Sequence, residues 1–174
     1  MISLEDPLYL ERFYLRHLHE ADANEKYLSW FSDEKVKQFI DYAKKNNKLN
    51  DLKKFIREKN ESNKCVFFGV FVTSNDDHIG NIKYEPINFE KKTAEMGILI
   101  GDINWRGKGV GPEVIIGSAK WLKEKFSIKK MTLGVLKENK AAVNAYQKIG
   151  FCSDYSELGK TSNSLRMTLN LDDI

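Results

Sequence analysis

Apolar residues follow two different spacings along this chain, and each spacing predicts a different kind of element. Residues 65–73 are almost continuously apolar and predict a buried strand. After polar turn residues at 74–77, a second strand is expected over residues 78–84, so that the two form a β-hairpin. A third strand is expected over residues 93–100, after another polar turn. The middle of the chain is therefore predicted to be a β-meander.

The chain after this meander alternates helices with a strand. Helical spacing follows the glycine-rich segment 106–111 and predicts a long amphipathic helix. Its inward positions are Val114, Ile115, Ser118, Trp121, Leu122 and Phe126. A strand is expected over residues 130–136, and a second helix is expected to be capped by Asn139 and stopped by Gly150. This order of elements is a crossover unit.

The first third of the chain reads as one strand followed by short helices. Residues 9–18 predict the strand, and helices are expected from Asp22 and from Asp33. A further helix is expected with Asn50 or Asp51 as its cap. The end of the chain is predicted to form two closing strands, at residues 151–158 and 164–171. With no internal repeat or linker, residues 1–174 are predicted to form one mixed α/β domain.

Length and composition support this reading. At 174 residues the chain has room for one domain, and 41% hydrophobic with 30% charged residues excludes a disordered protein. The longest apolar run, residues 65–72, is far shorter than the ~18 residues of a membrane span. The chain begins with acidic residues where a signal peptide has basic ones. We therefore expect a cytoplasmic protein that has no membrane partner.

Charge and cysteine content narrow the ligand classes. A net charge of +3 favours a small anion and falls short of a nucleic-acid-binding chain. A polyanion-binding module remains an alternative, although Asn and Asp interrupt its basic residues, which are Lys44, Lys45, Lys48, Lys53 and Lys54. Cys65 and Cys152 are expected to be buried thiols, and none of the three His residues forms a metal-binding motif. No metal site is predicted.

The glycine-rich segment carries the clearest chemical signal. Backbone N–H groups in such a turn, at the start of a helix, bind anions because glycine lets the backbone approach and the helix dipole favours negative charge. Arg106 and Lys108 add two cations. The segment does not match the dinucleotide-binding motif GxGxxG, because Pro112 stands in place of the third glycine. Residues 154–161 do not match the P-loop motif GxxxxGK(S/T), because Asp154 stands in place of its first glycine. These residues are compatible both with an anion-binding site and with a plain loop that caps a helix.

Three motifs in a fixed order resemble the GNAT superfamily of acetyl-CoA-dependent N-acetyltransferases. They are residues 94–100 as the splayed strand, Arg106-Gly-Lys-Gly-Val-Gly111 as the pyrophosphate loop, and residues 139–151 as the following helix. The resemblance is strongest to the branch of ribosomal-protein N-terminal acetyltransferases and amino-sugar N-acetyltransferases. It implies a single-domain fold with a mixed central sheet, a splayed central strand and helices on both faces, and it implies acetyl-CoA as cosubstrate.

The same resemblance implies how acetyl-CoA is held. Its pyrophosphate would meet the loop amides, and its pantetheine arm would pair with the edge of the splayed strand. The implied residues are Arg106, Gly107, Lys108, Gly109, Val110 and Gly111 for the pyrophosphate, and Ile98, Leu99 and Ile100 for the arm. Asn139 would contact the arm or a nearby water, and it would also suit a plain helix cap. Pro112 departs from the family pattern and removes one amide donor.

Two side chains are candidates for the chemistry. Tyr146 matches the family's general acid, which protonates the departing thiolate, although its spacing also suits a core aromatic. Glu95 stands where some members have a base acting through water, and it also suits an ordinary strand carboxylate. By the same resemblance, the backbone N–H around Leu99 would polarise the reacting carbonyl.

The acceptor is the least determined part of the prediction. By resemblance, its walls would include Trp30, Phe31, Tyr42 and Tyr84, although aromatic residues are more often core. We favour the primary amine of a small molecule, such as a nucleotide-linked amino sugar, over a protein N-terminus. A non-catalytic coenzyme A or polyanion-binding module is the second alternative. Neither a nucleic acid nor a membrane is expected as a partner, and the protein is expected to be a monomer or homodimer.

Overall fold

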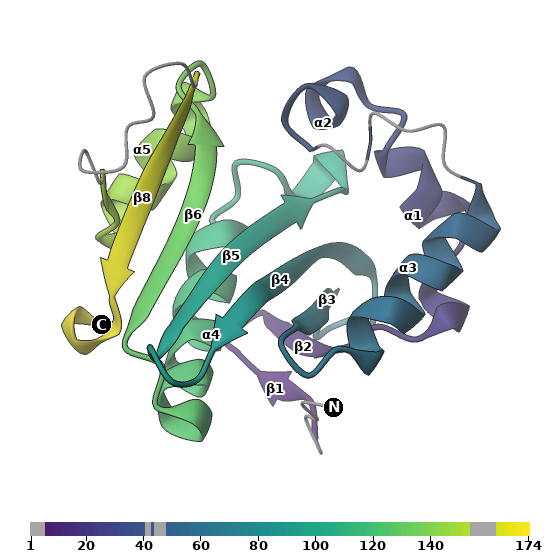
Figure 1. Cartoon of the computed structure of the whole chain (residues 1–174). Helices are drawn as coiled ribbons and strands as arrows, with labels where there is room; N and C mark the ends of the chain where they lie inside the picture. Colours follow the sequence, from purple (N-terminus) through teal and green to yellow (C-terminus); the bar gives the residue numbers. More distant parts are fainter. Residues whose placement is uncertain (1–5, 41–42, 44–47, 154–162) are drawn as a thin grey trace.

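In a computed structural model of the chain, eight strands form one mixed sheet in the order β1-β2-β3-β4-β5-β6-β8-β7 (Figure 1). The structure describes residues 6–40, 43, 48–153 and 163–174. The strands are β1 Leu8–Tyr9, β2 Phe13–His17, β3 Val66–Val72, β4 His78–Asn88, β5 Thr93–Ile100, β6 Lys130–Leu136, β7 Cys152–Ser153 and β8 Ser164–Asn170. The predicted meander corresponds to β3, β4 and β5, which pair as antiparallel neighbours.

The strands β5 and β6 form the one parallel pair in the described sheet, and they separate after a short distance. Their register covers Thr93 with Lys130, Ala94 with Met131 and Glu95 with Thr132. Beyond these pairs the two ribbons diverge (Figure 1). The predicted splayed strand is thus confirmed, and the second half of β5 has an edge that β6 does not pair. Such an edge keeps backbone donors and acceptors available.

Helices α4 (Val110–Phe126) and α5 (Lys140–Ile149) cover one face of the sheet. The larger core lies beneath them, with Val114, Ile115 and Leu122 of α4 completely or almost completely buried. Gly109 caps α4 in the left-handed conformation, with φ of 77°. As predicted, Asn139 caps α5 and Gly150 ends it. These caps fix where α4 and α5 begin and where α5 ends, and they thereby place α5 directly after β6, next to the diverging strands.

Helices α1 (Glu25–Trp30) and α3 (Leu49–Glu61) cover the opposite face, and the short helix α2 (Glu34–Phe39) lies beyond the ends of β4 and β5 (Figure 1). Tyr27, Leu52 and Ile56 are buried in the second core there. Asn24 caps α1 and, as predicted, Asp33 caps α2. Helices on both faces confirm the predicted fold class. No helix within the described residues combines the length and apolar character needed to cross a bilayer.

Several local predictions were wrong. Residues 9–18 form two strands, because a turn in which Leu10 N–H donates to the Phe13 carbonyl separates β1 from β2. The helix expected from Asp22 begins only at Glu25, because Asp22 ends a short 3-10 helix (Glu20–Asp22) and forms an ion pair with Arg16. Cys65 is buried, whereas Cys152 is exposed on β7. Residues 154–162, which include most of the strand expected at 151–158, lie outside the described residues.

The His78 imidazole makes the stability of this fold depend on pH. Its ring stacks on Phe71 at 4.8 Å, and its Nε2 lies 2.9 Å from the Gly80 carbonyl. Burial lowers the pKa of His78 to about 4. The unfolded chain, with a histidine pKa of about 6.5, therefore binds the proton more readily, and stability is lost as the pH falls through this window.

We expect the free energy of unfolding to fall by about 2 kcal/mol between about pH 7.5 and about pH 5. Urea unfolding at the two pH values measures this difference, and the variant His78→Gln should lose most of it. An unchanged pH dependence in that variant would show that another group is responsible.

Candidate functional site

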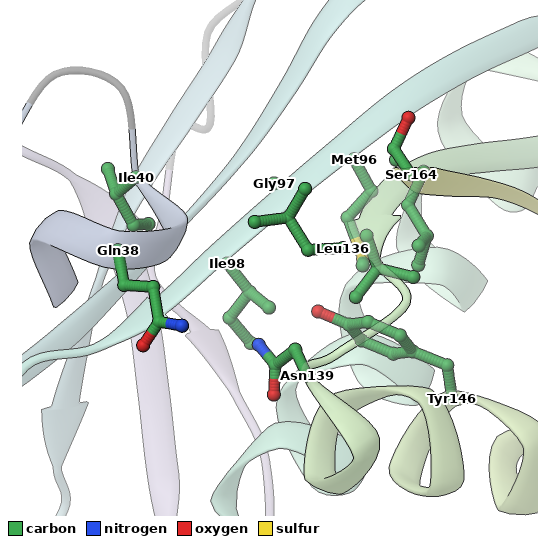
Figure 2. Close-up of a pocket in the computed structure, with 12 residues that line it drawn as sticks. Gln38, Ile40, Met96, Gly97, Ile98, Leu136, Asn139, Tyr146 and Ser164 are labelled. Carbon is green, nitrogen blue, oxygen red and sulfur yellow. The ribbon is translucent and has the colours of Figure 1, made fainter. Parts of the chain in front are cut away.

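A cavity of about 310 Å³ lies where β5 and β6 diverge, above the N-terminal part of α5 (Figure 2). Its described lining residues are Gln38, Ile40, Met96, Gly97, Ile98, Leu133, Gly134, Val135, Leu136, Asn139, Tyr146 and Ser164. The cavity therefore combines the open edge of β5 with two side chains that the sequence singled out, Asn139 and Tyr146. We call it the splay cavity.

Tyr146 projects from α5 with its hydroxyl directed into the splay cavity (Figure 2). Its ring packs on Phe151, with 5.7 Å between the ring centroids. Burial raises the pKa of Tyr146 to about 12. The phenol therefore stays protonated at neutral pH, and this position suits a group that donates a proton.

Asn139 caps α5 and also lines the splay cavity. Its side-chain oxygen accepts a hydrogen bond from Ala142 N–H at 3.2 Å, which caps α5. Its amide nitrogen is turned toward Ile98 (Figure 2). The helix cap thus fixes a side chain that also presents a donor to the splay cavity.

The glycine-rich loop leads from the 3-10 helix η3 (Ile103–Trp105) into α4. Gly107 and Gly109 both have positive φ, of 72° and 77°, which favours glycine at each position. A Cβ at Gly107 or Gly111 would meet no atom within 4 Å, so there is open space beside the backbone. The side chain of Val110 is buried in the core, so only its backbone could contact an anion at the loop. Lys108 places its ammonium 5.8 Å from the Trp105 ring centroid.

Arg12 holds this loop, and the sequence reading missed it. Its guanidinium donates to the Lys108 carbonyl at 3.0 Å and forms an ion pair with Glu113 at 2.8 Å. Its backbone N–H donates to the same Glu113 carboxylate. The contact joins residues about a hundred positions apart, so no local pattern could reveal it.

The guanidinium of Arg106, which was expected to face the pyrophosphate, is bonded to other parts of the protein. Its guanidinium donates to the carbonyls of Ile100 and Gly101 at 2.9 and 2.8 Å, and to the Asp33 carboxylate at 2.6 Å. Its backbone N–H donates to the Ile103 carbonyl. The hydrogen bond from Arg106 lowers the pKa of Asp33. Arg106 therefore fastens the loop to the end of β5 and to the cap of α2, and the amides that remain for an anion begin at Gly107.

A second cavity, of about 320 Å³, lies on the α3 side of β5. Its described lining residues are Tyr27, Phe31, Ile40, Phe55, Phe67, Asn81, Lys83, Gly97, Ile98 and Leu99. It shares Ile40, Gly97 and Ile98 with the splay cavity. The two cavities therefore meet at β5, where the missing side chain of Gly97 leaves open space. We call the second one the aromatic cavity.

The structure sorts the expected acceptor walls. Phe31 lines the aromatic cavity, but Trp30 is 5% exposed and packs so closely on Gly101 that a Cβ there would overlap its indole. Tyr84 is fully buried on the α4 face, with its hydroxyl 2.8 Å from Ser118 Oγ. Trp30 and Tyr84 are thus packed in the core and line neither of the two cavities, so the structure does not support their prediction as acceptor walls. Tyr42 lies outside the described residues.

Asn81 and Lys83 line the aromatic cavity and were missed. They lie on β4 one position on either side of Ile82, and side chains at alternate positions point to the same face of a strand. Phe55 of α3 and Phe67 of β3 were missed as well. The alternation along β4 could have revealed Asn81 and Lys83 once Tyr84 was assigned to the opposite face.

Glu95 lies on β5 outside the described lining of either cavity. Its carboxylate is half-exposed, 3.9 Å from the Arg166 guanidinium. It precedes Leu99 by four residues, which is roughly 13 Å along a strand. A role as base stays a prediction that requires a chain of water molecules.

No group of three or more His, Cys, Asp or Glu side chains in the described part of the chain is arranged to hold a metal ion. The described polar side chains that line the two cavities are two phenols, one hydroxyl, three amides and one ammonium: Tyr27, Tyr146, Ser164, Gln38, Asn81, Asn139 and Lys83. Such groups suit a transfer reaction between two bound molecules.

Comparisons with known proteins identify relatives of the same architecture. A family model described as acetyltransferase (GNAT) domain matches residues 12–152. Spermidine N(1)-acetyltransferase from Escherichia coli (strain K12) is 26% identical over 168 residues, which cover 92% of this chain and 82% of that protein.

Two solved structures show the same fold. RimL, a ribosomal L7/L12 alpha-N-protein acetyltransferase in complex with coenzyme A, has a TM-score of 0.82 at 12% identity and covers 97% of this chain and 100% of its own. The microcin C7 self immunity acetyltransferase MccE, in complex with acetyl-CoA and AMP, has a TM-score of 0.77 at 19% identity, with 92% and 93% covered.

The family match spans the diverging strands, the glycine-rich loop and α5, which are the three parts that carried the sequence resemblance. The resemblance is thereby confirmed. The chain belongs to the GNAT acetyltransferase family and is an acetyl-CoA-dependent N-acetyltransferase that acts on amines.

Proposed function

We propose that the protein moves an acetyl group from acetyl-CoA directly to the primary amine of a small, ring-bearing molecule, such as an amino sugar on a nucleotide carrier. The observation that carries this proposal is the meeting of the two cavities at Gly97 and Ile98. One cavity holds the phenol suited to protonate a leaving group, and the other holds aromatic walls. Two molecules bound on either side of β5 would have their reacting groups close together.

Acetyl-CoA fits the residues around the splay cavity. The amides from Gly107 to Gly111, the Lys108 ammonium and the start of α4 suit its phosphates, and the open space at Gly107 and Gly111 allows close approach. The edge of β5 that β6 leaves unpaired, at Ile98 and Ile100, suits the two amides of its pantetheine arm. The Ile100 carbonyl already accepts from Arg106. When bound, acetyl-CoA supplies an acetyl group activated as a thioester.

Each residue then has a definite task. A backbone N–H around Leu99 donates to the reacting carbonyl oxygen, and Tyr146 Oη donates its proton to the departing sulfur. Asn139 orients the arm through its amide nitrogen. The acceptor amine has to be neutral when it reacts, and its proton is removed either by a chain of water molecules or by Glu95 acting through water.

The size of the aromatic cavity favours a small acceptor. At about 320 Å³ it lies at the lower end of the range for small-molecule sites. Phe31, Phe55 and Phe67 provide faces on which a ring packs. The RimL structure makes a protein N-terminus the second candidate, because that protein shares the fold along the whole chain.

Release of coenzyme A, measured with a thiol reagent, tests the proposal across amino sugars, amine-bearing sugar nucleotides, polyamines and short peptides. We expect amino sugars or their nucleotides to be acetylated, with N-acetyl products identified by mass spectrometry. Acetylation of peptide N-termini, with none of these small amines acetylated, would replace the proposal with the protein N-terminal activity.

A further inference from the structure

Two lysines share one carboxylate beside the aromatic cavity. Lys59 Nζ lies 2.8 and 2.7 Å from the two Glu85 oxygens, and Lys83 Nζ lies 2.8 Å from Glu85 Oε2. Lys59 and Lys83 lie 5.4 and 5.9 Å from the Phe55 ring centroid. The cluster carries two positive charges and one negative charge.

This excess positive charge is partly shielded from water. The side chains of Lys59, Lys83 and Glu85 are only 22%, 30% and 25% exposed. Burial raises the pKa of Glu85, but the hydrogen bonds from the two lysines outweigh it and keep the pKa low, so the carboxylate stays charged. Lys83 lines the aromatic cavity, whereas no Asp or Glu is among the described residues that line it. The cluster of Lys59, Lys83 and Glu85 therefore has a net charge of +1, and it reaches the cavity through Lys83.

Asn81 provides a second polar group on the same face of β4. Its Nδ2 donates to the Tyr27 hydroxyl at 2.9 Å, and the side chain is 92% buried at the edge of the cavity, with 8% of its surface exposed. With Nδ2 bound, Oδ1 remains as an acceptor. Asn81 pairs directly with Leu99 in the sheet register. An amine that donates to Asn81 Oδ1 would thus lie next to the Leu99 backbone.

We propose that the aromatic cavity selects an acceptor that has an amine at one end and an anionic group, a phosphate or carboxylate, at the other. The Asn81 amide oxygen accepts from the amine, and the Lys83 ammonium pairs with the anion. The two residues are two positions apart, which is about 7 Å along a strand and matches the span of a monosaccharide. This inference rests on the proposed function and narrows its substrate class.

The same charge disfavours a polycation. A polyamine in this cavity would bring a further positive charge close to Lys83. Glu85 is already shared by two lysines, and no carboxylate is among the described residues that line the cavity. The relative from Escherichia coli is named for spermidine, so the inference separates the specificity of this chain from that of its relative.

Three acceptors test the inference in the wild-type enzyme. Glucosamine and glucosamine 6-phosphate share the ring and the amine and differ by the anion, while spermidine provides the polycation. We expect kcat/KM to be about tenfold to a hundredfold higher for glucosamine 6-phosphate than for glucosamine, and lowest for spermidine.

The variant Lys83→Met tests the residue. Glu85 keeps both hydrogen bonds from Lys59, so the substitution leaves no buried carboxylate unpaired. We expect the KM for glucosamine 6-phosphate to rise about tenfold to a hundredfold, with little change for glucosamine or acetyl-CoA. Lys83→Arg should keep the preference for the phosphate. The matched control Lys54→Met removes the same charge from the exposed side of α3 and should change nothing.

The outcomes separate this inference from the function on which it rests. If the amines are acetylated but the phosphate gives no advantage, or if Lys83→Met and Lys54→Met behave alike, the inference is wrong and the proposed function stands. If no small amine is acetylated and peptide N-termini are, the proposed function fails, and the inference fails with it.

Discussion

Replacing Tyr146 by Phe is expected to lower turnover by roughly 10²–10⁴-fold, the range for loss of a general acid. The ring and its packing on Phe151 remain, so only the hydroxyl directed into the splay cavity is lost. Binding of acetyl-CoA, measured as a thermal shift, should change little. Because burial raises the pKa of Tyr146 to about 12, its ionisation should not limit the wild-type rate at pH values well below that.

Tyr84→Phe is a matched control for this experiment. It also removes a buried tyrosine hydroxyl, but one that bonds with Ser118 beneath α4 and lines neither cavity. This variant should lose about 1 kcal/mol of stability and keep its turnover. Equal turnover in Tyr146→Phe and the wild type would mean that Tyr146 is only packing, and that water protonates the sulfur.

The second large effect is expected from Gly111→Glu. Gly111 is the second residue of α4, where a Cβ meets open space, so the new side chain causes no clash. A carboxylate in the first turn of a helix favours the free protein through the helix dipole and a better helix propensity. The same charge repels the phosphates of acetyl-CoA. We therefore expect an unchanged or higher melting temperature, together with a KM for acetyl-CoA about a hundredfold higher or more.

Gly111→Gln separates charge from size, because the two side chains have nearly the same shape. It should weaken acetyl-CoA binding much less than Gly111→Glu, and the difference should shrink at high salt. A normal acetyl-CoA thermal shift in Gly111→Glu would show that the loop does not hold the phosphates.

The sequence predicted best what depends on neighbouring residues. The helix α4, the strand β6 and the capped helix α5 were expected from spacing, glycine conformation and Asn139, and the structure has them. These signals are local, because each depends on residues within a few positions of one another. The family resemblance pointed to Phe31, Asn139 and Tyr146, and all three line a cavity: Tyr146 lies on α5, and Phe31 and Asn139 are the caps of α1 and α5.

The rest depended on contacts between distant residues. Tyr84 shares a face of β4 with Ile82 and packs in the core beneath α4, and the pattern of a strand does not reveal which helix covers which of its faces. The guanidinium of Arg106 is used by Asp33, which is 73 positions away. Both effects moved residues from the expected site into structural roles.

Initial-rate kinetics with acetyl-CoA and the acceptor varied together most directly test whether both cavities are occupied at once during transfer. Direct transfer across β5 at Gly97 predicts intersecting lines in double-reciprocal plots. It also predicts that the protein carries no covalently attached acetyl group after incubation with acetyl-CoA alone. Parallel lines, with an acetylated protein that passes its acetyl group to the amine, would contradict the account.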